Sequence, residues 1–256
     1  MGIERTDKWL DENFDQPIKL IKEQVLSSRV EDERKLYNYL RSFGMYSPNL
    51  KSKEIVESLK KHNYWTKASQ IFNRYKKGWK GPDIPIYIFP IHEGIDEAVS
   101  GVSFKNKMFL FLSPLKDIKE LESLIVHEYH HVCRLNQGTK VVHEYTVLDS
   151  IIMEGFAEFA VTKNCGEKYN AHWIRRFSDD QLEKFYHRFL KEHLRAKRTD
   201  KIHDRLIFGK GFYPKLLGYS VGYWLVKKAS QKQDFSINET FSIQSEEILK
   251  ILGLNT

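Results

Sequence analysis

The spacing of apolar residues divides the chain into a helical front, a strand-rich middle and a helical back. Across residues 6–78, apolar side chains such as Leu36 and Leu40 recur at intervals of three and four, the repeat of helices with one buried face. Between residues 81 and 114 the repeat changes to alternation and short apolar runs, which predicts three or four short strands. Residues 99–104 and 107–112 are expected to pair as a hairpin.

The helical repeat returns after residue 114 and continues through the rest of the chain. The first helix there should end near Gly138, because glycine readily adopts the left-handed conformation that terminates helices. Further helices are predicted at about residues 145–163, 180–194 and 214–229, with one more short helix within 234–256. We therefore predict an α+β fold that is mostly helical and has a small central β-sheet. Regions 1–80, 81–165 and 166–256 are expected to form one compact unit, since no Gly-, Ser- or Pro-rich linker separates them.

Composition and charge exclude several classes of protein. With 256 residues, 41% of them hydrophobic, the chain can bury a sizeable core and is neither disordered nor fibrous. Its net charge is +7, but the charged residues are spread along the chain, so no nucleic-acid partner is expected. Two cysteines are too few for a disulfide-rich scaffold and favour a reducing compartment. The first ten residues mix both charge signs and lack an apolar core, so no signal peptide is expected. No apolar run approaches the roughly 18 residues of a membrane span, and we expect a cytoplasmic protein without a membrane segment.

The predicted helix that follows the strands carries a histidine pair typical of metal sites. His127, Glu128 and His131 stand in the order H-E-x-x-H. Residues four apart differ by only about 40° around a helix, so the two imidazoles point the same way, as two ligands of one small cation require. Glu128 lies about 100° from His127, beside the cation, where a base for a bound water is expected.

A pair of histidines on a solvated helix face, with Glu128 paired to a basic residue, is the alternative. Apolar neighbours such as Leu124 argue against a solvated face. His130 is expected to pack or to face solvent, since a lone histidine is seldom a ligand. Cys133 lies about 200° from His131 and is expected to be a small buried residue.

The second long helix offers the third protein ligand that a catalytic zinc site needs. Glu154 and Glu158 are four apart, so they lie on one face of this helix, on a stripe that is otherwise apolar. Two carboxylates on an apolar stripe are costly unless they are neutralised. Glu154 as a metal ligand, with Glu158 hydrogen-bonded to a ligating histidine, would account for both carboxylates. A helix face salt-bridged to Lys163 or to a distant arginine is the alternative.

The order of these motifs resembles that of gluzincins, in which H-E-x-x-H is followed by E-x-x-x-D/E on the next helix. The metzincin pattern is absent, because Arg134 and Gln137 stand where that pattern has glycine and histidine. Together with the helical N-terminal region and the run G-Y-S-V-G-Y at residues 218–223, the motifs resemble the YjaZ-like family of predicted zinc-dependent proteases over essentially the whole chain.

This resemblance implies a zincin-like fold in which the small sheet packs against the H-E-x-x-H helix. It implies one zinc ion per chain, held by His127, His131 and Glu154, with Glu128 as the general base and Glu158 as the acid that supports a ligating histidine. Where gluzincins often have aspartate, Glu158 is one methylene longer.

The oxyanion that forms during hydrolysis usually needs a further hydrogen-bond donor from the protein. Tyr219 is the candidate we favour, ahead of Tyr223 and, behind them, His203 and Arg205. Two glycines four apart on the same predicted helix indicate the alternative, in which this helix packs closely and both tyrosines are boundary residues.

The sequence therefore predicts a zinc metallopeptidase that hydrolyses peptide bonds in a peptide or protein substrate, with Glu128 moving the proton. The alternative function is a catalytically silent peptide- or protein-binding module with a structural zinc site, which the intact Glu128 argues against. Endopeptidase and aminopeptidase activity both stay open. The predicted hairpin is placed to bind an extended substrate along its edge, although an ordinary hairpin would show the same pattern.

Overall fold

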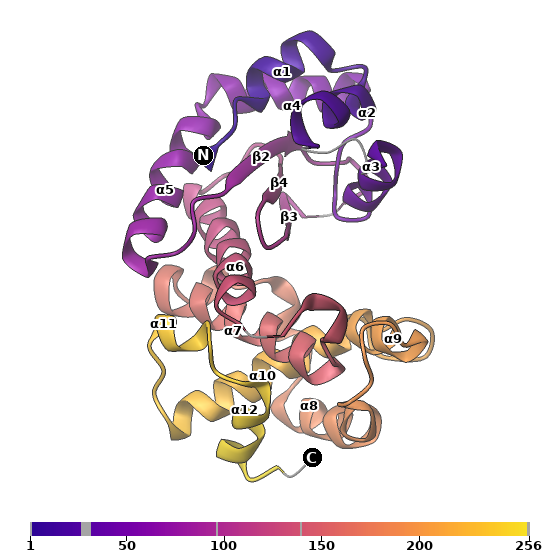
Figure 1. Ribbon diagram of the computed structural model, residues 1–256, viewed down its shortest axis with the longest axis vertical. Coiled ribbons are helices and arrows are strands. Elements are labelled where there is room, and N and C mark those ends of the chain that lie inside the picture. The colour runs from indigo at the N-terminus through magenta and orange to yellow at the C-terminus, as the bar shows by residue number, and fades with distance from the viewer. Residues whose placement is uncertain (1, 27–31, 96, 139, 255–256) are drawn as a thin grey trace. The chain divides into compact units, whose positions relative to one another are not determined.

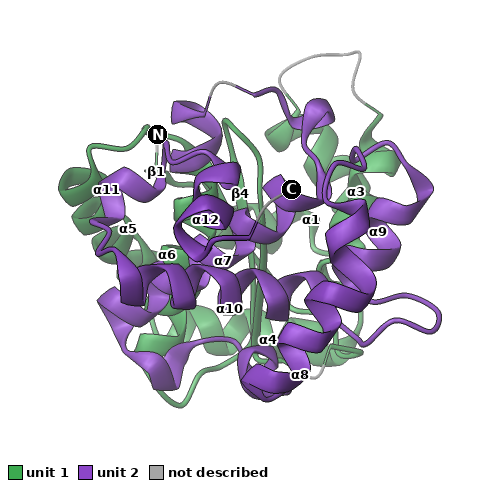
Figure 2. Ribbon diagram, turned by 90° about the horizontal axis from the view of Figure 1, so that it is seen from below, with its two compact units in different colours: residues 1–132 green, residues 133–256 purple. Residues whose placement is uncertain are grey.

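The computed structural model describes residues 2–26, 32–95, 97–138 and 140–254. These residues form a mostly helical α+β fold with one four-stranded sheet (Figure 1), as the sequence predicted. The chain divides into two compact units, unit 1 with residues 1–132 and unit 2 with residues 133–256 (Figure 2). The boundary between them falls within helix α6 (Ile118–Gln137).

Unit 1 is built on a mixed sheet with strand order β1-β2-β4-β3. The central strands β2 (Pro85–Pro90) and β4 (Met108–Leu112) are parallel, and nearly all of their residues are buried. Strands buried on both faces read as continuous apolar runs, which is why their sequences show so few polar residues. β3 (Val99–Ser103) pairs antiparallel with β4 and forms the predicted hairpin at one edge. β1 (Gly2–Ile3) forms the other edge, parallel to β2.

The N-terminal part of unit 1 is helical, as predicted. They are α1 (Thr6–Asn13), α2 (Pro17–Leu20), the π-helical turn η1 (Ile21–Val25), α3 (Glu33–Arg41), α4 (Leu50–Lys61) and α5 (Tyr64–Trp79). Side chains from α1 to α4, η1 and the sheet share one core, which includes Leu20, Leu40, Phe89 and Phe111.

Unit 2 is centred on two long helices, α7 (Val147–Cys165) and α10 (Leu217–Lys232). α7 begins after a capping box between Thr146 and Asp149, close to the predicted start. α10 begins at Leu217, not at residue 214 as the sequence predicted, because the residue before it has a left-handed φ of 58° and cannot continue a helix.

The two long helices of unit 2 approach closely at glycines. A Cβ atom on Gly155 of α7 would overlap the carbonyl oxygen of Gly222, and one on Gly222 would overlap the carbonyl oxygen of Ile151. A Cβ on Gly218 would stand 2.8 Å from the Cα of Ile207. The close packing that the glycines of α10 indicated is therefore present.

The remainder of unit 2 is more interrupted than the sequence predicted. The helix predicted over 180–194 is α8 (Asp179–Phe185), which continues as a π-helical turn, η5 (Tyr186–Leu190), and a 3-10 turn, η6 (Lys191–His193). The single helix predicted within 234–256 is two helices, α11 (Ile237–Thr240) and α12 (Ser245–Leu252), and residues 255–256 lie outside the described residues. The other short elements are η2 (Val142–Glu144), η3 (Glu167–Tyr169), η4 (His172–Arg175) and α9 (Lys201–Phe208).

None of the helices within the described ranges combines the length and the apolar character that crossing a bilayer requires.

Candidate metal centre

The two histidines of the H-E-x-x-H motif face each other on α6. Their Nε2 atoms are 3.1 Å apart, and their ring centroids are 4.7 Å apart. His131 is 6% exposed, and His127 is half-buried. The one-turn spacing therefore brings two imidazole nitrogens to one point, as the sequence predicted.

A carboxylate joins this pair to complete a group of three possible metal ligands. One ligand atom from each of His127, His131 and Glu154 lies within 4.8 Å of the others. Two nitrogens bound at about 2.0–2.1 Å to one tetrahedral zinc stand about 3.3 Å apart, which is close to the 3.1 Å between the two Nε2 atoms. Two imidazoles and one carboxylate are also a ligand set found at catalytic zinc sites, so the residues present fit this ion.

Glu128 is held by the edge strand of the sheet. Its side chain is 6% exposed, and Ser103 of β3 donates a hydrogen bond of 2.6 Å to the Oε2 atom of Glu128. The same hydroxyl lies 2.8 Å from the backbone oxygen of Glu128. Within the part of the chain that the structure describes, this carboxylate has no cationic partner. Ser103 was not singled out by the sequence, because no local pattern links residues 25 positions apart.

His130 and Cys133, which lie beside the H-E-x-x-H motif, are both buried. His130 is 0% exposed, and its ring packs edge-on against Trp79 with centroids 6.3 Å apart. Cys133 is a buried cysteine. His130 therefore packs in the core, which is one of the two outcomes expected, and Cys133 is the small buried residue that the sequence predicted.

Glu158 lies one turn after Glu154 on α7 and is 2% exposed. Its Oε2 accepts hydrogen bonds from the side-chain amide of Asn170, at 2.7 Å, and from the backbone N–H of Ala171, at 3.0 Å. Asn170 also donates to the Glu158 carbonyl, and its Oδ1 accepts from Thr162. These bonds fix the Glu158 carboxylate against α7. Nothing in the sequence marked Asn170 for this role.

The four candidate oxyanion donors all lie in unit 2: Tyr219, Tyr223, His203 and Arg205. Tyr219 is partly buried, with its ring 5.3 Å from that of Trp173 and 6.0 Å from that of Phe208. The Tyr223 hydroxyl lies 3.1 Å from the Thr162 hydroxyl, and burial raises the pKa of Tyr223 above its ordinary value. Arg205 is exposed.

His203, the fourth candidate, lies in a hydrogen-bonded chain. It is 4% exposed, its Nε2 is 2.9 Å from the hydroxyl of Ser150, and its Nδ1 is 2.9 Å from Oδ1 of Asp204. Ser150 is on α7, one turn before Glu154. The chain therefore orients the His203 ring from both nitrogens and ties it to the helix that carries the carboxylates.

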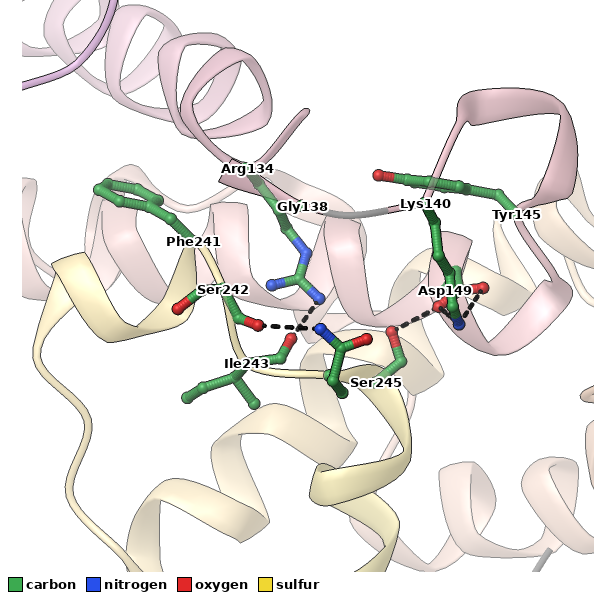
Figure 3. Close-up of a pocket in the computed structure, with 10 residues that line it drawn as sticks. Arg134, Gly138, Lys140, Tyr145, Asp149, Phe241, Ser242, Ile243 and Ser245 are labelled. Atoms are coloured by element: carbon green, nitrogen blue, oxygen red, sulfur yellow. Dashed lines mark hydrogen bonds and ion pairs between the residues drawn. The ribbon is translucent and has the colours of Figure 1, made fainter. Parts of the chain in front are cut away.

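A small pocket in unit 2 contains charged residues whose partners lie within the chain (Figure 3). It has a volume of about 30 Å³. Arg134 donates to the carbonyl oxygens of Thr240 and Ile243, and burial lowers its pKa.

Across this pocket, Lys140 and Ser245 bond the carboxylate of Asp149 at 2.9 Å each (Figure 3). Burial alone would raise the pKa of Asp149, but these bonds and the capping bond from Thr146 hold it below its ordinary value. The pocket is therefore a structural connection between α6, α7 and the C-terminal segment.

Comparison with known proteins gives the class to which the chain belongs. A model of the family described as predicted Zn-dependent protease (DUF2268) matches residues 64–250. The chain belongs to this family, and the resemblance drawn from its motifs is confirmed.

Particular relatives come from Bacillus subtilis (strain 168). The chain is 34% identical to the uncharacterized protein YjaZ over 257 residues, a match that covers 97% of this chain and 98% of YjaZ. It is 26% identical over 148 residues to the uncharacterized protein YjfC, covering 54% of this chain and 49% of YjfC.

Proposed function

We propose that the protein is a zinc-dependent metallopeptidase of the gluzincin type, in which His127, His131 and Glu154 hold one zinc ion. The family to which the chain belongs supports the class. The observation that carries the proposal is the position of Glu128. Its buried carboxylate has no cationic partner among the described residues, and it directly follows one of two histidines whose Nε2 atoms face each other. A carboxylate in such a place is costly unless a cation comes close to it.

Zinc, when bound, lowers the pKa of water and polarises the carbonyl group of the substrate. Glu128 is the general base: its carboxylate takes a proton from the attacking water and returns it to the nitrogen of the departing amine. The same carboxylate therefore acts first as the base toward the water and then as the acid toward the leaving amine. This role requires a carboxylate that does not bind the metal and is not held in a salt bridge. In this proposal, Glu128 is that carboxylate, and it has no cationic partner among the described residues.

Two further residues have supporting roles in this proposal. Glu158, fixed by Asn170 and Ala171, orients a ligating histidine by accepting its second ring N–H. Tyr219 donates a hydrogen bond from its hydroxyl to the oxyanion, and His203 is the next candidate. Substrates are peptides or proteins.

Metal analysis and a peptide-library cleavage assay on the same preparation test this function. We expect about one zinc per chain, cleavage by the zinc-loaded protein, loss of cleavage on chelation and recovery on adding zinc back. A protein that binds one zinc but cleaves no peptide in the library would favour the silent binding module.

A further inference from the structure

The edge strand β3 touches the Glu128 carboxylate at two positions on one face. Ser103 and Gly101 are two apart in the strand, so they face the same side of the sheet. The Ser103 hydroxyl bonds Oε2 of Glu128 at 2.6 Å. A Cβ atom on Gly101 would stand 2.7 Å from Cγ and 2.8 Å from Oε1 of the same side chain.

These two contacts act differently on the two carboxylate oxygens. The Ser103 hydroxyl has one proton, which it offers to Oε2 at 2.6 Å and to the backbone oxygen of Glu128 at 2.8 Å, so it holds the carboxylate through Oε2. Gly101 leaves the space beside Oε1 that any other residue would fill, because real Cβ atoms do not approach heavy atoms within 3.0 Å. The serine hydroxyl therefore occupies Oε2, whereas Oε1 faces the space that Gly101 leaves.

We propose that β3 positions the general base: Ser103 holds Oε2, and Gly101 leaves room for Oε1, which is the oxygen presented for proton transfer. This inference rests on the proposed function and deepens it, since Ser103 and Gly101 act through Glu128 and do not themselves touch the reacting atoms. An unsupported glutamate has several rotamers, and a displacement of about 1 Å at a catalytic group can lower turnover by about 10²-fold.

Thermal melting of the metal-free, full-length protein tests the contact without any activity. We expect Gly101→Ala to lower the melting temperature by about 2–4 °C, and to have almost no effect in a Glu128→Ala background, where the added methyl group has room. Ser103→Ala should likewise cost more in wild type than in Glu128→Ala. Equal losses in the two backgrounds would overturn the proposed contact.

Kinetics of the zinc-loaded protein test the positioning role. We expect Ser103→Ala to lower kcat by about 10- to 100-fold, with KM within about twofold and zinc content unchanged. Ser103→Thr, which keeps the hydroxyl, should recover most of kcat. Ser100→Ala is the matched control, because Ser100 lies on the same strand with its side chain on the opposite face, and it should leave kcat unchanged.

The two proposals fail in different ways. An active wild type with an inactive Glu128→Gln and a normal kcat for Ser103→Ala would overturn the positioning role and leave the peptidase intact. A zinc-loaded wild type that cleaves nothing would overturn both the peptidase and the positioning role, while the melting cycle would still show whether β3 holds Glu128.

Discussion

Two glutamates on α6 are almost equally buried, and the comparison between them separates structure from chemistry. Glu122 is 7% exposed and Glu128 is 6% exposed. Glu122 accepts hydrogen bonds from Tyr75 and Arg74 and pairs with Lys119 at 3.0 Å. Glu128 has the Ser103 hydroxyl instead, and no cation among the described residues.

The difference between the two carboxylates teaches how to recognise a site in a buried helix. Burial alone would raise the pKa of Glu122, but the bonds from Tyr75 and Lys119 and the charge of Arg74 hold it below its ordinary value. Its negative charge is thus neutralised by the chain itself. Glu128 has no such partner among the described residues, and two facing imidazoles stand beside it, which is the arrangement expected where a cation completes the structure.

The largest expected effect is on turnover. Glu128→Gln preserves the shape of the side chain and its hydrogen bond with Ser103, but the amide cannot take a proton. We expect turnover to fall by about 10³- to 10⁴-fold with zinc content and melting temperature close to wild type. Glu122→Gln is the matched control on the same helix, and its turnover per folded molecule should be normal. Equal turnover in Glu128→Gln and wild type would remove Glu128 from the role of base.

The next effect concerns the oxyanion donor. Tyr219→Phe removes one hydroxyl and keeps the ring that packs on Trp173 and Phe208, so we expect turnover to fall by about 10²- to 10³-fold at constant zinc content. Tyr223→Phe is the control, because its hydroxyl already bonds Thr162. Near-normal rates for both variants would favour the packing role and direct the search to His203 and Arg205.

A smaller effect is expected on stability, and we expect it in the Glu122 variant. Glu122→Gln keeps the volume of the side chain but loses the charge that Arg74 and Lys119 neutralise, so we expect the free energy of unfolding at pH 7 to drop by about 2 kcal/mol. Chemical denaturation of both variants measures it. A greater loss of stability in Glu128→Gln than in Glu122→Gln would contradict the division of roles.

The stability difference at Glu122 should depend on pH in a definite direction. The pKa of Glu122 is lowered in the folded protein, so its ionised form contributes stability above the unfolded pKa of about 4.3, and this contribution is lost as the pH falls through the folded pKa. The gap between wild type and Glu122→Gln should therefore be full at pH 7 and should close below about pH 4. A gap that stays constant down to pH 3 would contradict this assignment.

Local periodicity was enough to predict the elements that carry the candidate site. Helix α6, helix α7 and the β3–β4 hairpin follow from spacings within a few residues, and so does the shared direction of His127 and His131. Knowing which residues are buried does not change the elements that these spacings predict.

Contacts between distant segments were beyond the reach of the same reasoning. β1 has two residues and no period, and its partner β2 begins at Pro85. Ser103 and Asn170 reach their glutamates from other segments of the chain, and no spacing rule connects them. The start of α10 was predicted from Pro214, but the left-handed backbone at Leu216 delays the helix to Leu217.

Zinc titration of three metal-free proteins by calorimetry tests the central claim most directly. We predict that wild type and Glu128→Gln each bind one zinc with equal affinity, whereas Glu154→Ala loses at least about 100-fold in affinity. Replacing a residue that only hydrogen-bonds a metal ligand lowers affinity by about 10- to 100-fold, and loss of a ligand itself should cost no less. Unchanged binding by Glu154→Ala would move the third ligand elsewhere. The next candidates are the exposed His143 and Glu144 in the η2 turn before α7, and Glu158 on α7. A loss in Glu128→Gln as large as that in Glu154→Ala would contradict the claim that Glu128 stands off the metal as a base.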